Sequence, residues 1–294
     1  YTLAYPRQAF PALVDSVAAM LSRQADYAID DDLKARPNSM DYEVGGLDQT
    51  VADGPLSKRE ETMRSGLASW MAHQKGLAWA PVRWPAEALL AGERAFRTFT
   101  NTMRADLFDN MKASVQASRP GTWTEDDAKV IANAANVASG RGRLPWRSDG
   151  TLLSRIFFAP RWVWSTAQAA VGQPLWKGDR ATRMAIGKVY VRSAIGMAAY
   201  MTIRHLVYSL GADDEEHEPT YEWDLRSSNV GKMKVGETRL DSGRGFFQLA
   251  TLIARVVTGQ TKTQTGEIRR IGPGLFGGED TTEEASYYNE EDVR

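Results

Sequence analysis

Residues 93–111 read ERAFRTFTNTMRADLFDNM, and this stretch decides the class of fold. Its large apolar residues recur at intervals of three or four positions, at Phe96, Phe99, Met103, Leu107 and Met111. That spacing places them along one face of an α-helix. The pattern extends over residues 86–117 and stops at Pro120-Gly121. The sequence therefore predicts a long amphipathic helix here.

The same periodicity predicts further helices on both sides of this one. They cover residues 11–28, 57–74, 124–140, 152–171 with a kink at Pro160, 180–210 and 245–259. Ser57 and Thr124 each begin a capping box, and we expect Asp179 to cap the helix 180–210 and Gly211 to end it. Pro, Gly and Asp clusters make residues 28–53, 81–85 and 261–278 candidates for irregular structure.

The period changes in residues 232–241, where two short alternating runs flank Gly236-Glu237 and predict a β-hairpin. The expected fold is therefore all-α, a multi-helix bundle with one short β-hairpin. We expect an N-terminal segment (1–80), a helical core (81–278) and an acidic tail (279–294). Because the chain begins with Tyr1, we also expect it to be a fragment of a longer protein.

Composition excludes several classes of protein. The chain has 294 residues, 43% of them hydrophobic and 25% charged, which is typical of a folded chain. It has no cysteine, which excludes disulfides, thiolate metal sites and cysteine nucleophiles. Its most apolar stretch, residues 184–210, contains an uncharged run of 11 residues, Ser193–Ile203. A span of a bilayer needs about 20, so no transmembrane helix is predicted.

Catalytic and metal-binding patterns are absent from the sequence. The three histidines, His73, His205 and His217, are scattered and form no ligand pair. Residues 272–277 match GxGxxG by letters, but they follow no strand and open no helix, as a phosphate cradle requires. Asp30-Asp31-Asp32 is either a Mg²⁺ ligand cluster or, more commonly, a solvated helix end. We predict no catalytic residue, no metal ligand, no cofactor and no enzymatic activity.

Positive charge is concentrated in residues 141–210, which contain eleven Lys and Arg and two Asp, a formal charge of +9. Arginines and tryptophans interleave in its first part, a pattern that suits phosphate binding and base stacking. The candidate residues for contact with nucleic acid or a partner are Arg141, Arg143, Arg147, Arg155, Arg161, Trp146 and Trp162. A helix with a buried Trp face and solvated arginines is the favoured alternative, because Trp more often packs than stacks.

The helix expected at residues 180–210 is rich in small residues, such as Gly187 and Gly196, that allow close helix contact. A face that meets a membrane in another state would include Ile186, Val189, Ile195, Met197 and Tyr200. The favoured alternative is a helix packed in a soluble core, because Lys188, Arg192, Arg204 and His205 interrupt it.

Four stretches, taken in order, resemble the C-terminal region of very large bacteriophage virion proteins of the "large polyvalent" type. They are residues 93–111, NAANVASGRG (133–142), SRIFFAPRWVWSTAQ (154–168) and RSSNVGKMKVGETRLDSGRGFFQLATLIARVVTGQTK (226–262). None of them is a catalytic motif. The resemblance covers most of residues 87–265 and implies no individual functional residue.

The resemblance implies an internal virion or ejection protein without enzymatic activity, located in the capsid interior or the head-to-tail region. Proteins of this type leave with the genome in some phages, enter the host envelope, and in podovirus-like phages help to build the channel for DNA. The implied partners are further copies of the chain, portal, tail or other ejection proteins, packaged DNA and the host membrane. Two alternatives stay open: a helical domain of a giant virion-packaged enzyme, such as a virion RNA polymerase, with its catalytic part elsewhere, or a fixed head-to-tail connector plug.

Overall fold

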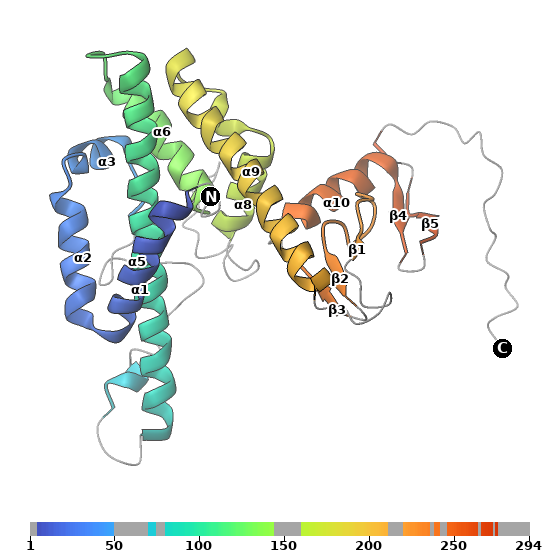
Figure 1. Cartoon of the computed structure of the whole chain (residues 1–294), viewed down its shortest axis with the longest axis horizontal. Helices are drawn as coiled ribbons and strands as arrows, with labels where there is room; N and C mark the ends of the chain where they lie inside the picture. The colour runs from blue at the N-terminus through green and yellow to red at the C-terminus, as the bar shows by residue number, and fades with distance from the viewer. Residues whose placement is uncertain are drawn as a thin grey trace, which may run out of the picture. The chain divides into compact units, whose positions relative to one another are not determined.

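The structure is a computed structural model and describes residues 5–49, 70–74, 80–143, 160–210, 220–235, 238–241, 246–263, 266–272 and 274–275. Helices make up most of these residues, and two small antiparallel sheets lie in the C-terminal part (Figure 1). The predicted class, a mostly α-helical fold with a short β-hairpin near residues 232–241, is confirmed.

The chain divides into two compact units, residues 1–202 and 203–294. This division differs from the three segments expected from the sequence. Helix α1 (Pro6–Leu21) packs along helix α5 (Ala80–Ser118), and both lie within the first unit. The expected acidic tail, residues 279–294, lies outside the described residues.

Helix α5 is the long amphipathic helix that residues 93–111 predicted. Met103, Leu107 and Met111 are at most 2% exposed, and Leu107 and Met111 pack in the core with residues of helix α6 (Glu125–Ala138). The face changes character toward the N-terminus, where Phe96 is 44% exposed. Polar residues occupy the buried side there instead, and Arg97 and Thr98 are at most 2% exposed.

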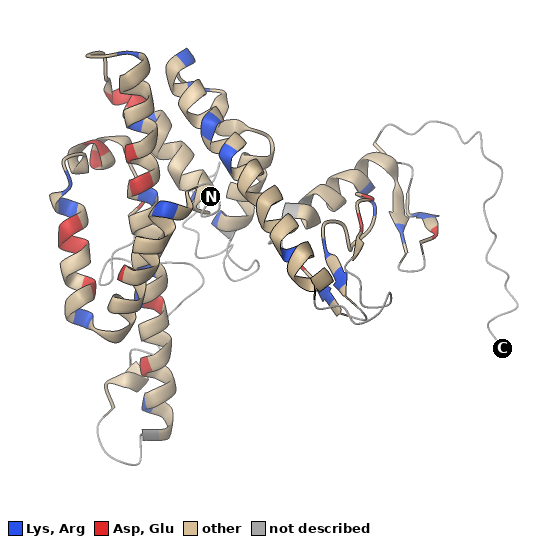
Figure 2. Ribbon diagram, viewed as in Figure 1, with Lys and Arg blue, Asp and Glu red and all other residues tan. Residues whose placement is uncertain are grey.

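The prediction of irregular structure at residues 28–53 is wrong for residues 28–35, which complete helix α2 (Arg23–Ala35), and for helix α3 (Ser39–Gly45). Residues 46–49 contain no helix or strand, and residues 50–53 lie outside the described residues. Leu33 and Tyr42 are the buried apolar residues of these helices, which is too few to give a visible periodicity, and acidic side chains make further contacts with α5. The acidic residues of α2 and α3 are coloured red in Figure 2. Asp26 and Asp30 of α2 both bind Arg97, and Asp41 of α3 binds Lys112.

The break expected at residues 81–85 is also absent, because α5 runs continuously from Ala80. Pro81 lies in the first turn, where backbone N–H groups have no partner within the helix. Pro85 removes one further hydrogen bond, the one to the carbonyl of Pro81, while its ring faces solvent. The helix therefore tolerates both prolines.

The capping box at Thr124 is confirmed. The Thr124 hydroxyl accepts a hydrogen bond from the backbone N–H of Asp127, and the Asp127 carboxylate accepts one from the backbone N–H of Thr124 at 3.0 Å. The helix expected at residues 180–210 is helix α9 (Arg180–Leu210), and the Asp179 carboxylate caps it by accepting from the backbone N–H of Thr182 at 2.9 Å.

Helix α8 (Pro160–Ala170) begins at the proline where a kink was expected, and a short 3₁₀ helix, η4 (Gln173–Leu175), follows it. Residues 152–159 of that prediction lie outside the described residues, as does most of the helix expected at 57–74.

The second unit contains the predicted hairpin, strands β2 (Met233–Val235) and β3 (Thr238–Leu240), with Met233 opposite Leu240. Strand β1 (Thr220–Tyr221) adds to it in the order β1-β2-β3. Helix α10 (Phe246–Thr258) follows where it was expected. Residues 261–278 are not all loop, since β4 (Gln260–Lys262) pairs with β5 (Ile268–Arg270). Three-residue strands without apolar alternation leave too little pattern to detect.

Candidate anion-binding site

Two of the candidate arginines bind an internal carboxylate. Arg141 is 3% exposed, and its guanidinium lies 3.1 Å from Asp48 Oδ2, which Arg161 also contacts at 3.1 Å. The Asp48 backbone is fixed as well, because its N–H donates to Asn136 and its carbonyl accepts from Arg104. Arg141 and Arg161 therefore tie the segment after α3 to α6 and α8 in this conformation.

Trp162 is 40% exposed, and its ring lies against Gly140, where an added Cβ would come within 2.7 Å of the ring atom Cδ1. The interleaved arginines and tryptophans are thus not one continuous surface. Arg147, Arg155 and Trp146 lie outside the described residues. Arg143 lines a pocket.

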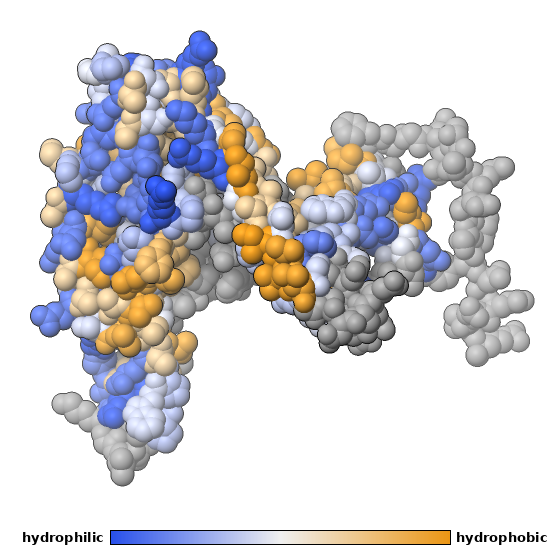
Figure 3. Space-filling model, in the orientation of Figure 1, coloured by the Kyte–Doolittle hydropathy of each residue, from blue (hydrophilic) through white to orange (hydrophobic). Residues whose placement is uncertain are grey.

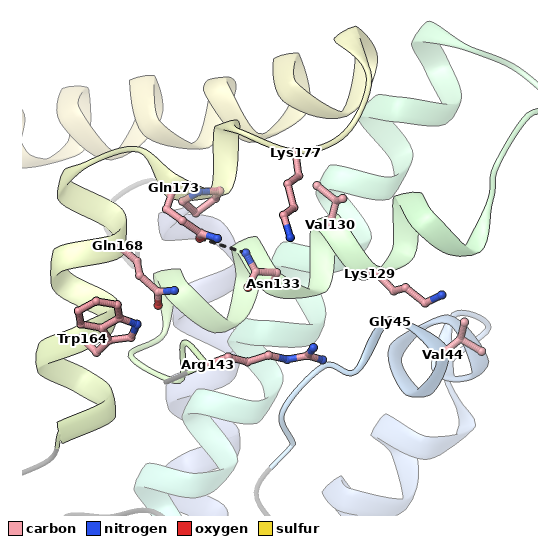
Figure 4. Close-up of a pocket in the computed structure, with 11 residues that line it drawn as sticks. Val44, Gly45, Lys129, Val130, Asn133, Arg143, Trp164, Gln168, Gln173 and Lys177 are labelled. Carbon is pink, nitrogen blue, oxygen red and sulfur yellow. Dashed lines mark hydrogen bonds between the residues drawn. The ribbon is translucent and has the colours of Figure 1, made fainter. Parts of the chain in front are cut away.

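This pocket has a volume of about 560 Å³ and is formed by α3, α6, α8, η4 and the segments next to them (Figure 4). Val44 and Gly45 come from the end of α3 and Arg143 from the segment after α6. The other lining residues are Lys129, Val130, Asn133, Trp164, Gln168, Gln173, Pro174 and Lys177.

The described lining of the pocket contains three cations and no carboxylate. Lys129 lies 3.7 Å from Glu125 and 3.8 Å from Asp126 of its own helix, and these are loose, exposed pairs. Within the described residues, Arg143 and Lys177 form no ion pair with any acidic side chain. In Figure 4 the Lys177 side chain extends toward Asn133, whereas Lys129 points away from it. The positive charge inside the pocket therefore comes mainly from Arg143 and Lys177.

Amide side chains and one indole form the rest of the polar lining. The Asn133 amide donates to Gln173 Oε1 at 3.3 Å. The Gln168 oxygen Oε1 is buried and has no hydrogen-bond partner among the described residues. Gln168 lies tightly against Gly142, where an added Cβ would come within 2.0 Å of Oε1. A buried acceptor without a donor is costly.

Asp127 fixes the elements that carry Lys129 and Lys177. Its carboxylate accepts from Arg119 at 2.6 Å and from the Thr182 hydroxyl at 3.0 Å, which joins the start of α6 to the start of α9. Burial alone would raise the pKa of Asp127, but hydrogen bonds from Thr124, Thr182 and Arg119 lower it below its ordinary value. The carboxylate is therefore ionised at neutral pH and holds this junction in place.

The residues proposed for a membrane-facing side of α9 do not share one environment. Ile186 is 1% and Val189 is 7% exposed, and both pack in the core of the first unit. Ile195 is 63% and Tyr200 is 40% exposed, while Met197 is half-buried. Ile186 and Val189 are thus unavailable to a membrane in this conformation. Among the described helices, none combines the length and the apolar character that crossing a membrane requires.

In the described part of the chain, no three His, Asp or Glu side chains lie close enough together to hold a metal ion. Asp30 binds Arg97 and Asp31 binds Lys34, so two of the three consecutive aspartates have protein partners. Sequence reasoning missed the amide residues of the pocket, Lys129 and Lys177. Asn133 and Gln168 do fall within stretches that carry the resemblance, but only the packing of α6 against α8 brings them together.

The pocket is therefore a built cavity with a positive and amide-rich lining, which is suited to an anion that also carries hydrogen-bonding groups. A comparison of the chain with models of known protein families, with curated proteins and with solved structures found no match.

Proposed function

We propose that this chain is a non-enzymatic internal virion or ejection protein of a bacteriophage that self-associates near the portal and tail and assists genome delivery. The resemblance of its four stretches to large virion proteins suggests this role. The observation that supports self-association is an exposed apolar face on the last two turns of α9. It consists of Ile203, Leu206, Val207 and Leu210, which are 62%, 55%, 60% and 79% exposed (Figure 3).

These four side chains are three, four and seven positions apart, so they lie on one side of the helix. Arg204 donates to the carbonyl of Leu240 at 2.8 Å, which joins this part of α9 to strand β3 within the second unit. Monomeric proteins rarely leave contiguous apolar surface uncovered. A second copy of the chain, presenting the same face, would bury it in a symmetric contact.

Mass spectrometry of purified particles, before and after triggered genome release, tests the role. Peptides of this chain should be present in full particles and lost from emptied ones. If they persist at the same copy number, the chain is instead a fixed part of the connector. If they are absent from full particles, the virion role is excluded.

Sedimentation velocity of the isolated chain tests self-association. Leu206→Glu places a charge in the centre of the apolar face and should shift the population toward the monomer by at least about tenfold in Kd, because an unpaired charge would be buried. Leu89→Glu is the matched control, since Leu89 lies on α5 and is 59% exposed. Equal effects of the two variants, or a wild-type chain that is monomeric at all concentrations, would remove the α9 face from the proposal.

A further inference from the structure

We propose that the pocket between α3, α6 and α8 binds a nucleotide unit, that is, a phosphate ester that carries a planar base. The phosphate binds at Arg143 and Lys177, and the base lies among Trp164, Gln168 and Asn133. This inference does not rest on the virion role proposed above, because every observation that carries it lies within the pocket.

The cations account for the phosphate. Arg143 and Lys177 reach the pocket from two different segments, after α6 and before α9, and the described lining offers no carboxylate to neutralise them. The Arg143 guanidinium lies over the end of α3, where an added Cβ at Gly46 would come within 2.9 Å of Nη2. Guanidinium and ammonium groups form short, charge-assisted hydrogen bonds with phosphate oxygens. Neither Arg141 nor Arg161 competes for this role, since both bind Asp48.

The uncharged residues of the lining favour a ligand that carries a base over phosphate alone. Asn133 and Gln168 bring side-chain amides to the lining, which can donate to and accept from the edge of a base, whereas a phosphate dianion has no N–H to offer an amide oxygen. A nucleobase has N–H groups on its edge. Trp164 adds an aromatic surface to the same lining, and an indole stacks on any base.

The size of the pocket limits the ligand to about one nucleotide. Its volume of about 560 Å³ is within the usual range of small-molecule sites and too small for a duplex. The nucleotide therefore comes from one of two sources: a free mononucleotide, or a single residue of a DNA strand that is unpaired at that point. Both present the same phosphate and base.

Isothermal titration calorimetry with the full chain distinguishes the parts of this proposal. The probes are thymidine 5′-monophosphate, thymidine, inorganic phosphate and an eight-residue oligothymidylate. Thymidine monophosphate should bind at least about tenfold more tightly than thymidine or phosphate, because each of these lacks one half of the contacts. Phosphate that binds as tightly as the nucleotide would overturn the base contact, and an absence of binding by both nucleotide probes would overturn the site.

Charge-removing variants locate the binding. The double variant Arg143→Gln/Lys177→Gln should bind thymidine monophosphate more weakly by about tenfold or more. The matched control is Arg180→Gln/Arg183→Gln, which removes two exposed charges at the start of α9, outside the pocket lining. Gln168→Leu should weaken binding of the nucleotide and leave binding of inorganic phosphate unchanged. Equal losses in the pocket and control variants would mean nonspecific attraction to positive charge and would overturn the proposal.

Binding of the oligothymidylate shows whether the bound nucleotide comes from a DNA strand or from a free mononucleotide. If the source is a DNA strand, it should bind more tightly than the mononucleotide, and the slope of log K against log salt should flatten by about 0.7 for each phosphate contact that the double variant removes. If the source is a free nucleotide, the mononucleotide should bind at least as tightly as the oligonucleotide. A strand whose affinity is unchanged in the double variant binds elsewhere, and the DNA source is then excluded.

Discussion

Arg97 lies within α5 with 2% of its surface exposed, and it binds two carboxylates of α2, Asp26 and Asp30. A charge at this depth is tolerated only because it is paired on both sides. Burial raises the pKa of Asp30 even though Arg97 donates to it, which means that the carboxylate depends on this arginine to remain ionised.

Replacing Arg97 with Met should therefore lower the free energy of unfolding by about 3–5 kcal/mol, because it leaves buried carboxylates without a cation. The loss should be largest at pH 7. It should shrink as the pH falls toward the raised pKa of Asp30, since protonation removes the buried charge. Urea unfolding at several pH values measures this. Lys34→Met is the control, because Lys34 and Asp31 form an exposed pair worth at most about 1 kcal/mol. Similar losses for both variants would contradict the argument.

The pKa of Asp224, in the second unit, is shifted in the opposite direction to that of Asp30. Hydrogen bonds from the Arg226 guanidinium and backbone N–H lower its pKa from the ordinary 3.8 to about 2. The contact therefore contributes stability above about pH 4 and loses it as the pH falls toward 2. In an NMR titration of the carboxyl group, Arg226→Met should raise the midpoint toward the value of about 3.9 found in unstructured peptides. A midpoint that does not move would show that Arg226 is not the cause.

At the scale of the elements, glycine positions separate close packing from open surface. Gly45 is the last residue of α3 and packs against α6. An added Cβ would lie 2.6 Å from the carbonyl oxygen of Ala128, and this oxygen cannot shift because it belongs to the backbone of α6. Gly92 lies inside α5 with no atom within 4 Å of the same position.

The same substitution should thus have opposite effects at these two sites. Gly45→Ala is expected to destabilise the chain by about 1–3 kcal/mol through overpacking. Gly92→Ala should stabilise it by about 0.5–1 kcal/mol, because alanine loses less backbone freedom in a helix. Thermal unfolding of both variants measures the two changes in stability. A stabilising Gly45→Ala would mean that α3 does not pack on α6 as described.

Elements whose signal is local were predictable from the sequence. The Thr124 capping box, the Asp179 cap and the apolar spacing of α5 each involve residues a few positions apart, and each is confirmed. Helix α3 and the full length of α2 were missed because the contacts that stabilise them join residues about 70 positions apart, such as Arg97 with Asp30. The pocket was missed for the same reason, apart from Arg143, since Lys129, Gln168 and Lys177 meet only after α6, α8 and η4 pack together.

At the scale of the whole molecule, the chain contains two compact units whose boundary falls at residues 202 and 203, inside α9. Each unit has its own buried residues. Ile131 and Phe108 are buried in the first unit, and Met233 and Val230 in the second. A core of its own allows each unit to unfold as a cooperative whole.

Equilibrium unfolding in urea should therefore show two transitions, and single variants should move them separately. Arg97→Met should lower the midpoint of the first unit only. Gly231→Ala should lower that of the second only, because Gly231 has a φ of +68° and an added Cβ would lie 2.4 Å from the ring of Phe247. Tryptophan fluorescence and circular dichroism, followed together, distinguish two transitions from one. If both variants lower the midpoint of one common transition, α9 couples the units into a single cooperative structure. The division at residue 202 then has no thermodynamic meaning.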